Sequence, residues 1–345
     1  MKKEFNAIKW IEYPWVGEVT KYACQQPFLF LQKAFTNFFR GDTCYPQFKK
    51  KGIHDSFYIG NDHIQVKGKS VRLPILGWVN MREEVRFFGE VKSATISRIA
   101  DMWFVSFQIL CKDQPPLCEN QAKVGVDLGI KNFATLYDGE RVISIEGPKP
   151  LKMQLKKLKR DQRRLSRKQR GSNNRAKQRL KVARRHYRIS CIRQDSLHQL
   201  TTYLTYRYQT IVIEDLNVKG MMSNRCLSRS VSDMGFHEFR RQLQYKAAMH
   251  GNHVEVVDRW FPSTKRCSSC HELHREMSLK ERQFTCQHCG LSMDRDENAA
   301  RNLLNTVSST GIDACGEGGS GLCENVSETI LGEARTEYCT DLYRF

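Results

Sequence analysis

The stretch that decides the fold is KVGVDLGIKNFATLY, residues 123–137. Val124 and Val126 alternate with small or polar neighbours, so the segment predicts a buried β-strand that turns at Gly129. The strand also carries the carboxylate of Asp127. A carboxylate at such a position is costly unless it is paired, hydrogen-bonded or bound to a metal ion. The first strand of the predicted sheet therefore holds an acid that needs a partner.

Two later segments carry further acids at the ends of regular elements. TIVIEDLNV, residues 210–218, places Glu214 at the end of an apolar strand, and MDRDENAARNLL, residues 293–304, places Asp296 near the start of an Ala/Leu helix. Acids on two strands and one helix start are the ligands that a divalent-metal nuclease site requires. For each acid alone, a structural role is the simpler interpretation. Together, in this order, they favour catalysis.

The order of the elements predicts the fold of this region. After the first strand, residues 134–137 and 141–145 form two more strands across an Asp-Gly hairpin turn. Helices, a fourth strand, the amphipathic helix 236–250 and a fifth strand at 253–258 follow, then a cysteine-rich insert and a last helix. This is the order of the ribonuclease H-like fold, in which the first and fourth strands are neighbours at the centre of the sheet.

In such a sheet, Asp127 and Glu214 project from adjacent strands toward one face, and the last helix brings Asp296 near them. Oxygen ligands of this kind suit Mg²⁺ or Mn²⁺, and two such ions about 3.5–4 Å apart can activate water and stabilise the leaving oxygen of a phosphodiester. Two alternatives stay open. Asp294 competes with Asp296, although helix N-capping is its simpler role and Asp296 is the preferred ligand. Asp215 competes with Glu214, and strand alternation alone does not decide between them.

Two cysteine pairs separated by fifteen residues predict a metal-binding module. Each CxxC pair forms a tight knuckle that directs two thiolates at one ion, and Gly290 permits the turn after the second pair. The complete Cys₄ set predicts a structural zinc site, because no coordination position stays open for catalysis. A redox dithiol pair is the disfavoured alternative. The four predicted ligands are Cys267, Cys270, Cys286 and Cys289.

The first residues of the chain have a helical and aromatic pattern. Residues 19–39 carry apolar side chains at helical spacing, although Pro27 can divide them into two shorter helices. Five phenylalanines in this stretch could stack on nucleic-acid bases. A helix that buries its aromatic face is the simpler interpretation. These residues are Phe28, Phe30, Phe35, Phe38 and Phe39.

Residues 55–111 change to a β pattern. Short strands with regular turn signals predict a small β-barrel or sandwich. The preceding loop adds Lys49, Lys50 and Lys51, which either contact phosphate or remain solvated. A proline-containing connector at residues 113–119 marks the predicted domain boundary. The strands are expected at residues 56–59, 63–66, 70–73, 77–81, 89–98 and 103–111, with a hairpin turn at Ala100-Asp101.

The composition restricts the class of protein. The 345-residue chain carries a formal net charge of +19, and such a surplus repels itself unless a polyanion compensates it. No apolar run approaches the ~20 residues that cross a bilayer, and the N-terminus lacks the apolar core of a signal peptide. Thirteen cysteines, an odd number, without a secretion signal argue against a disulfide framework. A cytoplasmic nucleic-acid-binding protein with no membrane or small-molecule partner is expected.

Much of the excess charge lies in residues 151–189. Between Lys152 and Arg188 there are seventeen Lys or Arg residues and a single acid, Asp161. Leucines at helical spacing on both sides of Gly171 predict a helical hairpin. Like charges at i,i+4 destabilise these helices unless an anion compensates them, so nucleic-acid contact is favoured over a merely solvated hairpin. The expected contact residues are Lys156, Lys157, Lys159, Arg160, Arg163, Arg164, Arg167, Lys168, Arg184 and Arg185.

Six stretches span most of residues 35–305: FRGDTCYPQFKKKGIHDSF, VGVDLGIKNFATL, IEDLNVKGM, FRRQLQYKA, DRWFPSTKRCSSC and CQHCGLSMDRDENAARNLL. Their combination resembles the TnpB (OrfB) family of transposon-encoded proteins. The resemblance implies an RNA-guided DNA endonuclease with a RuvC-like nuclease domain, a guide RNA and a target DNA. It carries the family's catalytic triad onto Asp127, Glu214 and Asp296, and its zinc ligands onto the four cysteines named above. It also implies that the β-barrel and the N-terminal helices hold the guide RNA and read a short motif beside the target.

Two features depart from the family pattern. His271 stands where the family usually has glycine after the second ribbon cysteine. The chain also starts late, because the family's opening strand, which completes the barrel, and its first helix are expected before Met1. A truncated or non-catalytic nucleic-acid-binding regulator of the transposon is therefore the alternative function. A transposase that joins DNA strands without RNA would use the same metal chemistry and ranks below both.

The predicted architecture is α+β and multidomain. Residues 1–118 form N-terminal helices and a small β-barrel. Residues 119–262 and 291–308 form a ribonuclease H-like (RuvC-like) α/β domain that includes the basic hairpin. Residues 263–290 form the inserted zinc ribbon, and residues 309–345 form a flexible tail. The predicted function is a metal-dependent, RNA-guided DNA endonuclease.

Overall fold

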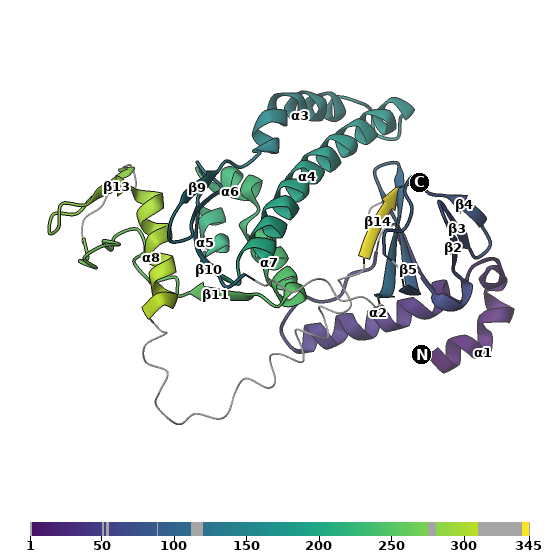
Figure 1. The fold of residues 1–345 in the computed structure, drawn as a ribbon. Coiled ribbons are helices and arrows are strands. Elements are labelled where there is room, and N and C mark those ends of the chain that lie inside the picture. The colour runs from purple at the N-terminus through teal and green to yellow at the C-terminus, as the bar shows by residue number, and fades with distance from the viewer. Residues whose placement is uncertain are drawn as a thin grey trace. The chain divides into compact units, whose positions relative to one another are not determined.

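The computed structural model describes residues 2–49, 52, 55–87, 89–111, 120–274, 281–309 and 340–344. The chain divides into two compact units, one made of Met1–Gln114 with Gly332–Phe345 and the other of Pro115–Leu331. Both appear in Figure 1. The connector predicted at residues 113–119 lies outside the described residues.

Three helices begin the first unit: α1 (Lys2–Glu12), the 3₁₀ helix η1 (Pro14–Glu18) and α2 (Lys21–Phe39). Thr20 caps α2, since its hydroxyl accepts a hydrogen bond from the Ala23 amide at 3.3 Å. The sequence allowed a break at Pro27, but α2 runs through it. Proline removes one backbone donor and strains one turn, and the remaining turns of a 19-residue helix hold it together.

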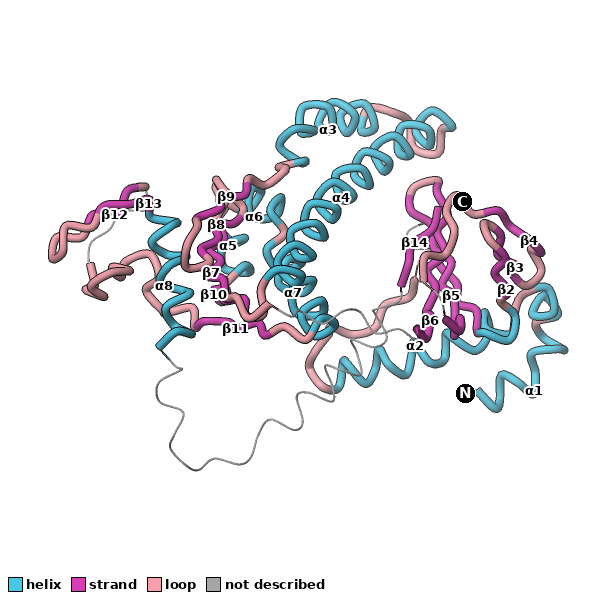
Figure 2. The backbone as a smooth tube through the Cα atoms, viewed as in Figure 1, coloured by secondary structure: helices cyan, strands magenta, loops and turns pink. Residues whose placement is uncertain are grey.

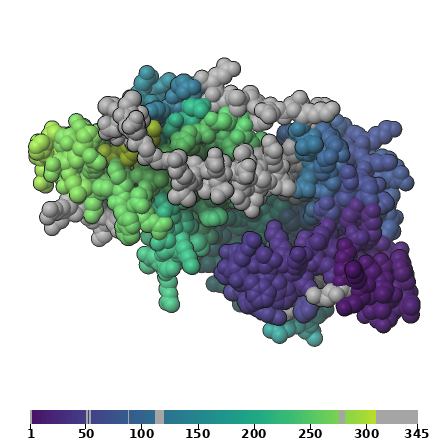
Figure 3. Space-filling view, turned by 90° about the horizontal axis from the view of Figure 1, so that it is seen from below, coloured from purple at the N-terminus to yellow at the C-terminus, as the bar shows by residue number. Residues whose placement is uncertain are grey.

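The simpler interpretation expected α2 to bury its aromatic stripe in a core. The structure does not show this. No residue of α2 is fully buried; Phe30 is 51% exposed and Phe39 is 78% exposed. Phe35 and Phe38 instead pack edge-on against Tyr45, with ring centroids 5.8 and 5.4 Å apart. The purple surface in Figure 3 belongs to α1 and α2 and faces the viewer.

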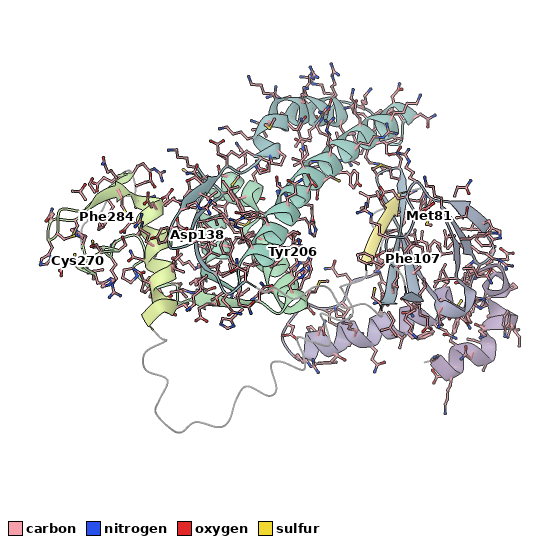
Figure 4. The ribbon with its side chains drawn as sticks, viewed as in Figure 1. Met81, Phe107, Asp138, Tyr206, Cys270 and Phe284 are labelled. Atoms are coloured by element: carbon pink, nitrogen blue, oxygen red, sulfur yellow. The ribbon has the colours of Figure 1, made fainter. Side chains whose placement is uncertain are left out.

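The strands of the first unit form two sheets that share one core. One sheet has the order β1-β5-β6-β14 and the other has the order β2-β3-β4; in the described residues no strand pairing closes them into one barrel. Their shared core includes Ile59, Val71, Met81, Val105 and Phe107, two of which are labelled in Figure 4. The strands close to those predicted are β1 (Ser56–Gly60), β2 (Gln65–Lys67), β3 (Ser70–Leu73), β4 (Gly77–Asn80), β5 (Gly89–Ile99) and β6 (Met102–Cys111), with η2 (Asn61–His63) between β1 and β2.

The last strand, β14 (Thr340–Arg344), pairs antiparallel with β6 of the first unit. These residues were expected to belong to a flexible tail, but they add a strand to the edge of a sheet. The rest of the predicted tail beyond residue 309 lies outside the described residues.

A five-stranded mixed sheet forms the centre of the second unit, with the order β11-β10-β7-β8-β9 (Figure 2). As the element order predicted, the first and fourth strands of this unit, β7 and β10, are parallel neighbours. Their register pairs Val124 with Ile211 and Val126 with Ile213. The bounds are β7 (Lys123–Leu128), β8 (Ala134–Tyr137), β9 (Val142–Ile145), β10 (Thr210–Glu214) and β11 (His253–Val257).

The two faces of this sheet have different coverings. Val124, Val126, Ile211 and Ile213 point into the main core, where α4 (Asn173–Arg207), α6 (Ser228–Met234) and α7 (Phe236–His250) contribute apolar side chains. Helix α8 (Arg295–Ser309) contacts β7, β8 and β10 instead. In Figure 1, α8 and the α4–α7 layer lie on opposite sides of the strands. Since alternate residues of a strand face opposite ways, Gly125 and Asp127 point toward α8.

The basic hairpin consists of α3 (Pro150–Ser166) and α4, which turn at Gly171 with φ +85°. After this turn α4 runs without a break to Arg207. Asp161, the single acid between Lys152 and Arg188, is fully buried and forms an ion pair of 2.7 Å with Arg185. This pair joins α3 to α4 inside an otherwise basic segment.

The remaining elements of the second unit are small. Two short helices, α5 (Val218–Ser223) and α6, lie between β10 and α7 and were not predicted. The cysteine-rich insert contains the two-stranded sheet of β12 (Gln283–Thr285) and β13 (Ser292–Asp294). Across the described ranges, none of the helices has the length and apolar character needed to cross a membrane.

Gly125 lets α8 approach β7 closely, and a Gly125→Ala substitution tests this contact. A Cβ atom at this position would overlap the Ala300 carbonyl oxygen and lie 2.8 Å from the Leu304 amide nitrogen. Because both atoms belong to the backbone, we expect the free energy of unfolding to fall by about 2 kcal/mol or more in chemical denaturation. Gly17→Ala is the control, since its Cβ would meet only Trp10 at 3.7 Å. Equal stability of the two variants would contradict the assigned packing.

Candidate functional site

Asp127 occupies a buried position on the α8 side of β7. The residue is 7% exposed, and no hydrogen bond to its carboxylate is found among the described residues. Burial, followed by the negative charges of Asp296 and Glu214, raises the pKa of this carboxyl to about 8. Arg295 opposes the shift. The acids predicted on β7, β10 and α8 are therefore close enough to repel one another.

Glu214 and its neighbour Asp215 have opposite environments, which bears on the choice between them. Continuing the β7–β10 register by one residue places Glu214 beside Asp127. Burial raises the pKa of Glu214, and the charge of Asp215 adds to the shift. Asp215 instead accepts hydrogen bonds from Arg259 and Arg240, which lower its pKa. Glu214 thus forms no ion pair within the described residues, whereas Asp215 forms two.

Asp294 and Asp296 also separate into two roles. The Asp294 carboxylate accepts hydrogen bonds from the amides of Asp296 at 2.9 Å and Glu297 at 3.4 Å. This is the N-cap geometry that satisfies the first free amides of a helix, so the capping role predicted for Asp294 is confirmed. Asp296 follows in the first turn of α8 and carries the largest charge effect on Asp127.

The acids do not form a compact cluster as the cysteines do. Within the part of the chain that the structure describes, one group of His, Cys, Asp or Glu side chains has its ligand atoms within 4.8 Å of one another, and it is the four-cysteine group. Like charges without a cation repel, so the neighbouring carboxylates add to the effect of burial on the pKa of Asp127. The arrangement can attract a divalent cation, whose charge would remove that repulsion.

The four predicted cysteines meet in the insert and could bind a metal ion such as zinc. Their sulfur atoms all lie within 4.8 Å of one another, with Cys267 and Cys286 buried. The backbone amide of Cys289 and the imidazole of His274 lower the pKa of Cys286, which favours the thiolate that a metal needs. Cys270 and the core residue Phe284 are labelled in Figure 4.

The two knuckles share one backbone geometry. The amide of His271 donates to the Cys267 carbonyl and the amide of Gly290 donates to the Cys286 carbonyl, each at 3.0 Å. Both donors have a left-handed conformation, with φ +63° at His271 and +73° at Gly290. Glycine adopts this conformation readily and histidine does not, so the departure noted in the sequence places strain in the first knuckle.

Two buried asparagines, which the sequence analysis missed, attach the insert to α8. Asn298 accepts a hydrogen bond from the Ser268 amide at 3.0 Å and donates to the Arg266 carbonyl at 2.7 Å. Asn302 donates to the Ser263 and Arg266 carbonyls at 2.8 and 2.6 Å. Both side chains lie on the helix that carries Asp296, so the insert and the acids share one support. Their i,i+4 spacing, with Ala299 and Ala300 between them, was the available sequence signal.

The predicted nucleic-acid contacts have different surroundings. Lys49 lies 5.0 Å from the centre of the Phe30 ring, while Lys50 and Lys51 lie outside the described residues. Arg185 is held by Asp161 and Gln154 inside the hairpin. Lys168 is partly buried. The other predicted hairpin residues are exposed: Lys156, Lys157, Lys159, Arg160, Arg163, Arg164, Arg167 and Arg184.

Comparisons with known proteins agree with this arrangement. Residues 106–225 match a family described as "Probable transposase", OrfB_IS605, and residues 236–303 match the "Cas12f1-like, TNB domain". A "Putative RNA-guided DNA endonuclease" of Streptomyces pristinaespiralis is 38% identical over 313 residues, which are 89% of this chain and 76% of that protein. The "Putative RNA-guided DNA endonuclease InsQ" of Escherichia coli K12 is 35% identical over 322 residues, 89% of this chain and 79% of that protein.

These matches cover both the sheet with its acids and the cysteine insert, so the class is that of transposon-encoded proteins with this pair of modules. The chain belongs to the TnpB (OrfB) family, as the sequence motifs predicted. Among solved structures, a Cas12f1–sgRNA–target DNA complex aligns with 78% of this chain and 68% of that chain, at 14% identity and a TM-score of 0.49.

An Asp127→Asn substitution tests the repulsion among the acids. The folded-state pKa of Asp127 is about 8, above its ordinary value of 3.8, so the stability from its neutral form is complete below pH 4 and lost as pH rises through 8. In magnesium-free buffer, wild-type unfolding free energy should fall relative to Asp127→Asn by up to about 1.4 kcal/mol per pH unit between pH 5 and 8. Chemical denaturation at several pH values measures it, with exposed Glu140→Gln as the control. Parallel profiles for wild type and Asp127→Asn would exclude the raised pKa.

A His271→Gly substitution tests the strain in the first knuckle. Removing a side chain from a left-handed position should raise the unfolding free energy by about 1 kcal/mol, measured by denaturation of the zinc-loaded protein. His288→Gly in the second knuckle is the matched control, because φ at His288 is not positive. The unfolding free energy of that variant should fall slightly, because glycine gives the unfolded chain more backbone freedom. A loss of stability in His271→Gly would show that the imidazole outweighs the strain.

Proposed function

We propose that this protein is an RNA-guided DNA endonuclease of transposon origin that hydrolyses phosphodiester bonds with divalent metal ions. The observation that carries the proposal is the position of Asp127: it is buried, and its pKa is raised by acids from two other elements. Strongly perturbed acids gathered in this way are typical of functional sites. The related RNA-guided DNA endonucleases of S. pristinaespiralis and E. coli support the same activity.

In this proposal Asp127, Glu214 and Asp296 hold Mg²⁺ or Mn²⁺. The donor set fits these ions, since carboxylate oxygens are their preferred protein ligands and a cation would relieve the repulsion at Asp127. When bound, two ions would activate water and stabilise the leaving oxygen. The chain itself orients the ligands: β7 and β10 present two of them side by side, and the Asp294 cap fixes the first turn of α8. Asp215 stays outside the ligand set because its two arginines already neutralise it.

The domain assignment is part of the same proposal. The strand order of the second unit supports a ribonuclease H-like, RuvC-like nuclease domain over residues 119–262 and 291–308. Residues 263–290 form a ribbon in which Cys267, Cys270, Cys286 and Cys289 hold a structural zinc, since four thiolates leave no open position. The two sheets of the N-terminal unit correspond to the predicted small β-barrel, in an open form.

The nucleic-acid partners are a guide RNA and a target DNA. The exposed lysines and arginines of α3 and α4 have one sign of charge and support a polyanionic ligand along the hairpin. The exposed aromatic rings of α2 support base stacking in the first unit, with Lys49 over Phe30 as a cationic neighbour.

The decisive experiment identifies RNA that co-purifies with the protein and then uses it to program cleavage of a matched DNA. Asp127→Ala should reduce cleavage in Mg²⁺ by at least about 10³-fold, because a metal ligand is lost, while RNA affinity changes less than a few-fold. Glu140→Ala, an exposed acid of the neighbouring hairpin, should cut at the wild-type rate. Cleavage by Asp127→Ala would refute the assigned ligands. Bound RNA with no cleavage by wild type would favour a binding regulator.

A further inference from the structure

A cavity of about 230 Å³ lies beside Glu214 in the second unit. One part of its wall is formed by Glu214 itself and by Leu128, the residue that follows Asp127. The rest comes from the start of α5, from α7 and from the segment after β11. The nuclease mechanism proposed above does not use these segments. Four side chains of the wall are basic or can become so: Lys219, His237, Arg240 and Arg259.

The charge of this wall is not balanced. Arg240 donates to one oxygen of Asp215 at 2.5 Å, and Arg259 donates to the other oxygen through its Nε at 3.0 Å. One carboxylate neutralises only one of the two guanidinium charges. Lys219 and His237 form no ion pair within the described residues and are exposed. A net positive wall therefore borders Glu214, one of the three acids.

The two arginines also keep donors for a ligand. Asp215 receives Nε and one terminal nitrogen of Arg259, and one terminal nitrogen of Arg240. The described contacts leave the Nε and second terminal nitrogen of Arg240, and the second terminal nitrogen of Arg259, for another acceptor. Guanidinium groups present paired N–H donors whose spacing matches the oxygens of a phosphate.

We propose that Lys219, Arg240 and Arg259 form a subsite for a backbone phosphate of the nucleic-acid strand held at the acids, with His237 at its edge. This rests on the proposed function, since the acids place the reacting phosphodiester next to the cavity. A cation site and an anion site side by side fit successive phosphates of one strand: one would lie at the acids and the next would pair with the arginines. Asp215 then competes with that phosphate for the same donors.

A purely structural role for these residues gives a different expectation. Asp215 and its arginines could serve only to hold the end of β10 against α7. Removing the carboxylate would then lower the stability of the protein and would not increase its affinity for a phosphate. If the subsite exists, removing the carboxylate releases two arginines and strengthens phosphate binding. The sign of the effect of Asp215→Asn therefore separates the two roles, and a gain in affinity does not arise from misfolding.

The experiment uses the full-length, zinc-loaded protein, Mn²⁺ and the dinucleotide thymidylyl-(3′→5′)-thymidine. Electron paramagnetic resonance first counts the bound Mn²⁺. Enhanced ³¹P relaxation of the dinucleotide then reports phosphate bound near that ion. Arg259→Gln should weaken the dinucleotide about tenfold, and Asp215→Asn should strengthen it about threefold. Arg241→Gln is the matched control, because Arg241 lies on α7 outside the cavity wall and pairs with Glu238 at 2.9 Å; it should bind as wild type.

Unchanged dinucleotide affinity in both Arg259→Gln and Asp215→Asn, with Mn²⁺ bound, would overturn the subsite and leave the nuclease proposal intact. A wild-type protein that binds no Mn²⁺ would instead contradict the nuclease proposal, before any dinucleotide is added. Equal losses in Arg259→Gln and Arg241→Gln would also overturn the subsite, since they would reflect general surface charge.

Discussion

The close approach of α8 to β7 at Gly125 is the constraint on which the second unit depends. A side chain at this position would run into the backbone of Ala300 and Leu304. Because Asp127 follows two residues later on the same face of the strand, this approach sets how near Asp296 comes to it. Asn298 and Asn302 of the same helix hold the cysteine insert through buried hydrogen bonds. One helix thus connects the insert, the sheet and the acids.

In the described part of the second unit, buried acids away from the candidate site are paired with arginines, whereas Asp127 in the site is not. Asp161 is paired with Arg185, and Asp233 accepts hydrogen bonds from the first amides of α3 and pairs with Arg193 at 3.2 Å. Asp127 has no such partner among the described residues, and its pKa is raised to about 8. A buried acid kept without a partner costs stability, and such costs concentrate at sites whose partner is a ligand.

Much of this arrangement could be predicted from the sequence, because the spacing of apolar residues and the turn-forming residues are local features. The alternation around Val126 and the Asp-Gly turn gave the bounds of β8 as the structure has them. The two CxxC motifs gave the cysteine cluster. Distances between the acids were not accessible, since they depend on how α8 packs at Gly125. The choice between Glu214 and Asp215 also needed Arg240 and Arg259, which are remote in sequence.

The differences between the structure and the sequence-based expectations have equally specific causes. A proline inside a helix of 19 residues removes one hydrogen bond and does not end the helix, so α2 passes Pro27. The stripe of phenylalanines on α2 has helical spacing, but a periodic stripe indicates one face and does not say what covers it.

The central claim is that acids from β7, β10 and α8 bind one set of divalent ions. Diffraction from crystals grown with Mn²⁺, recorded at the manganese absorption edge, tests it most directly. The account predicts an anomalous peak within ligand distance, about 2.0–2.4 Å, of carboxylate oxygens of Asp127, Glu214 and Asp296. A peak bound by Asp215 or Asp294 instead, or no peak between these elements at saturating Mn²⁺, would contradict it.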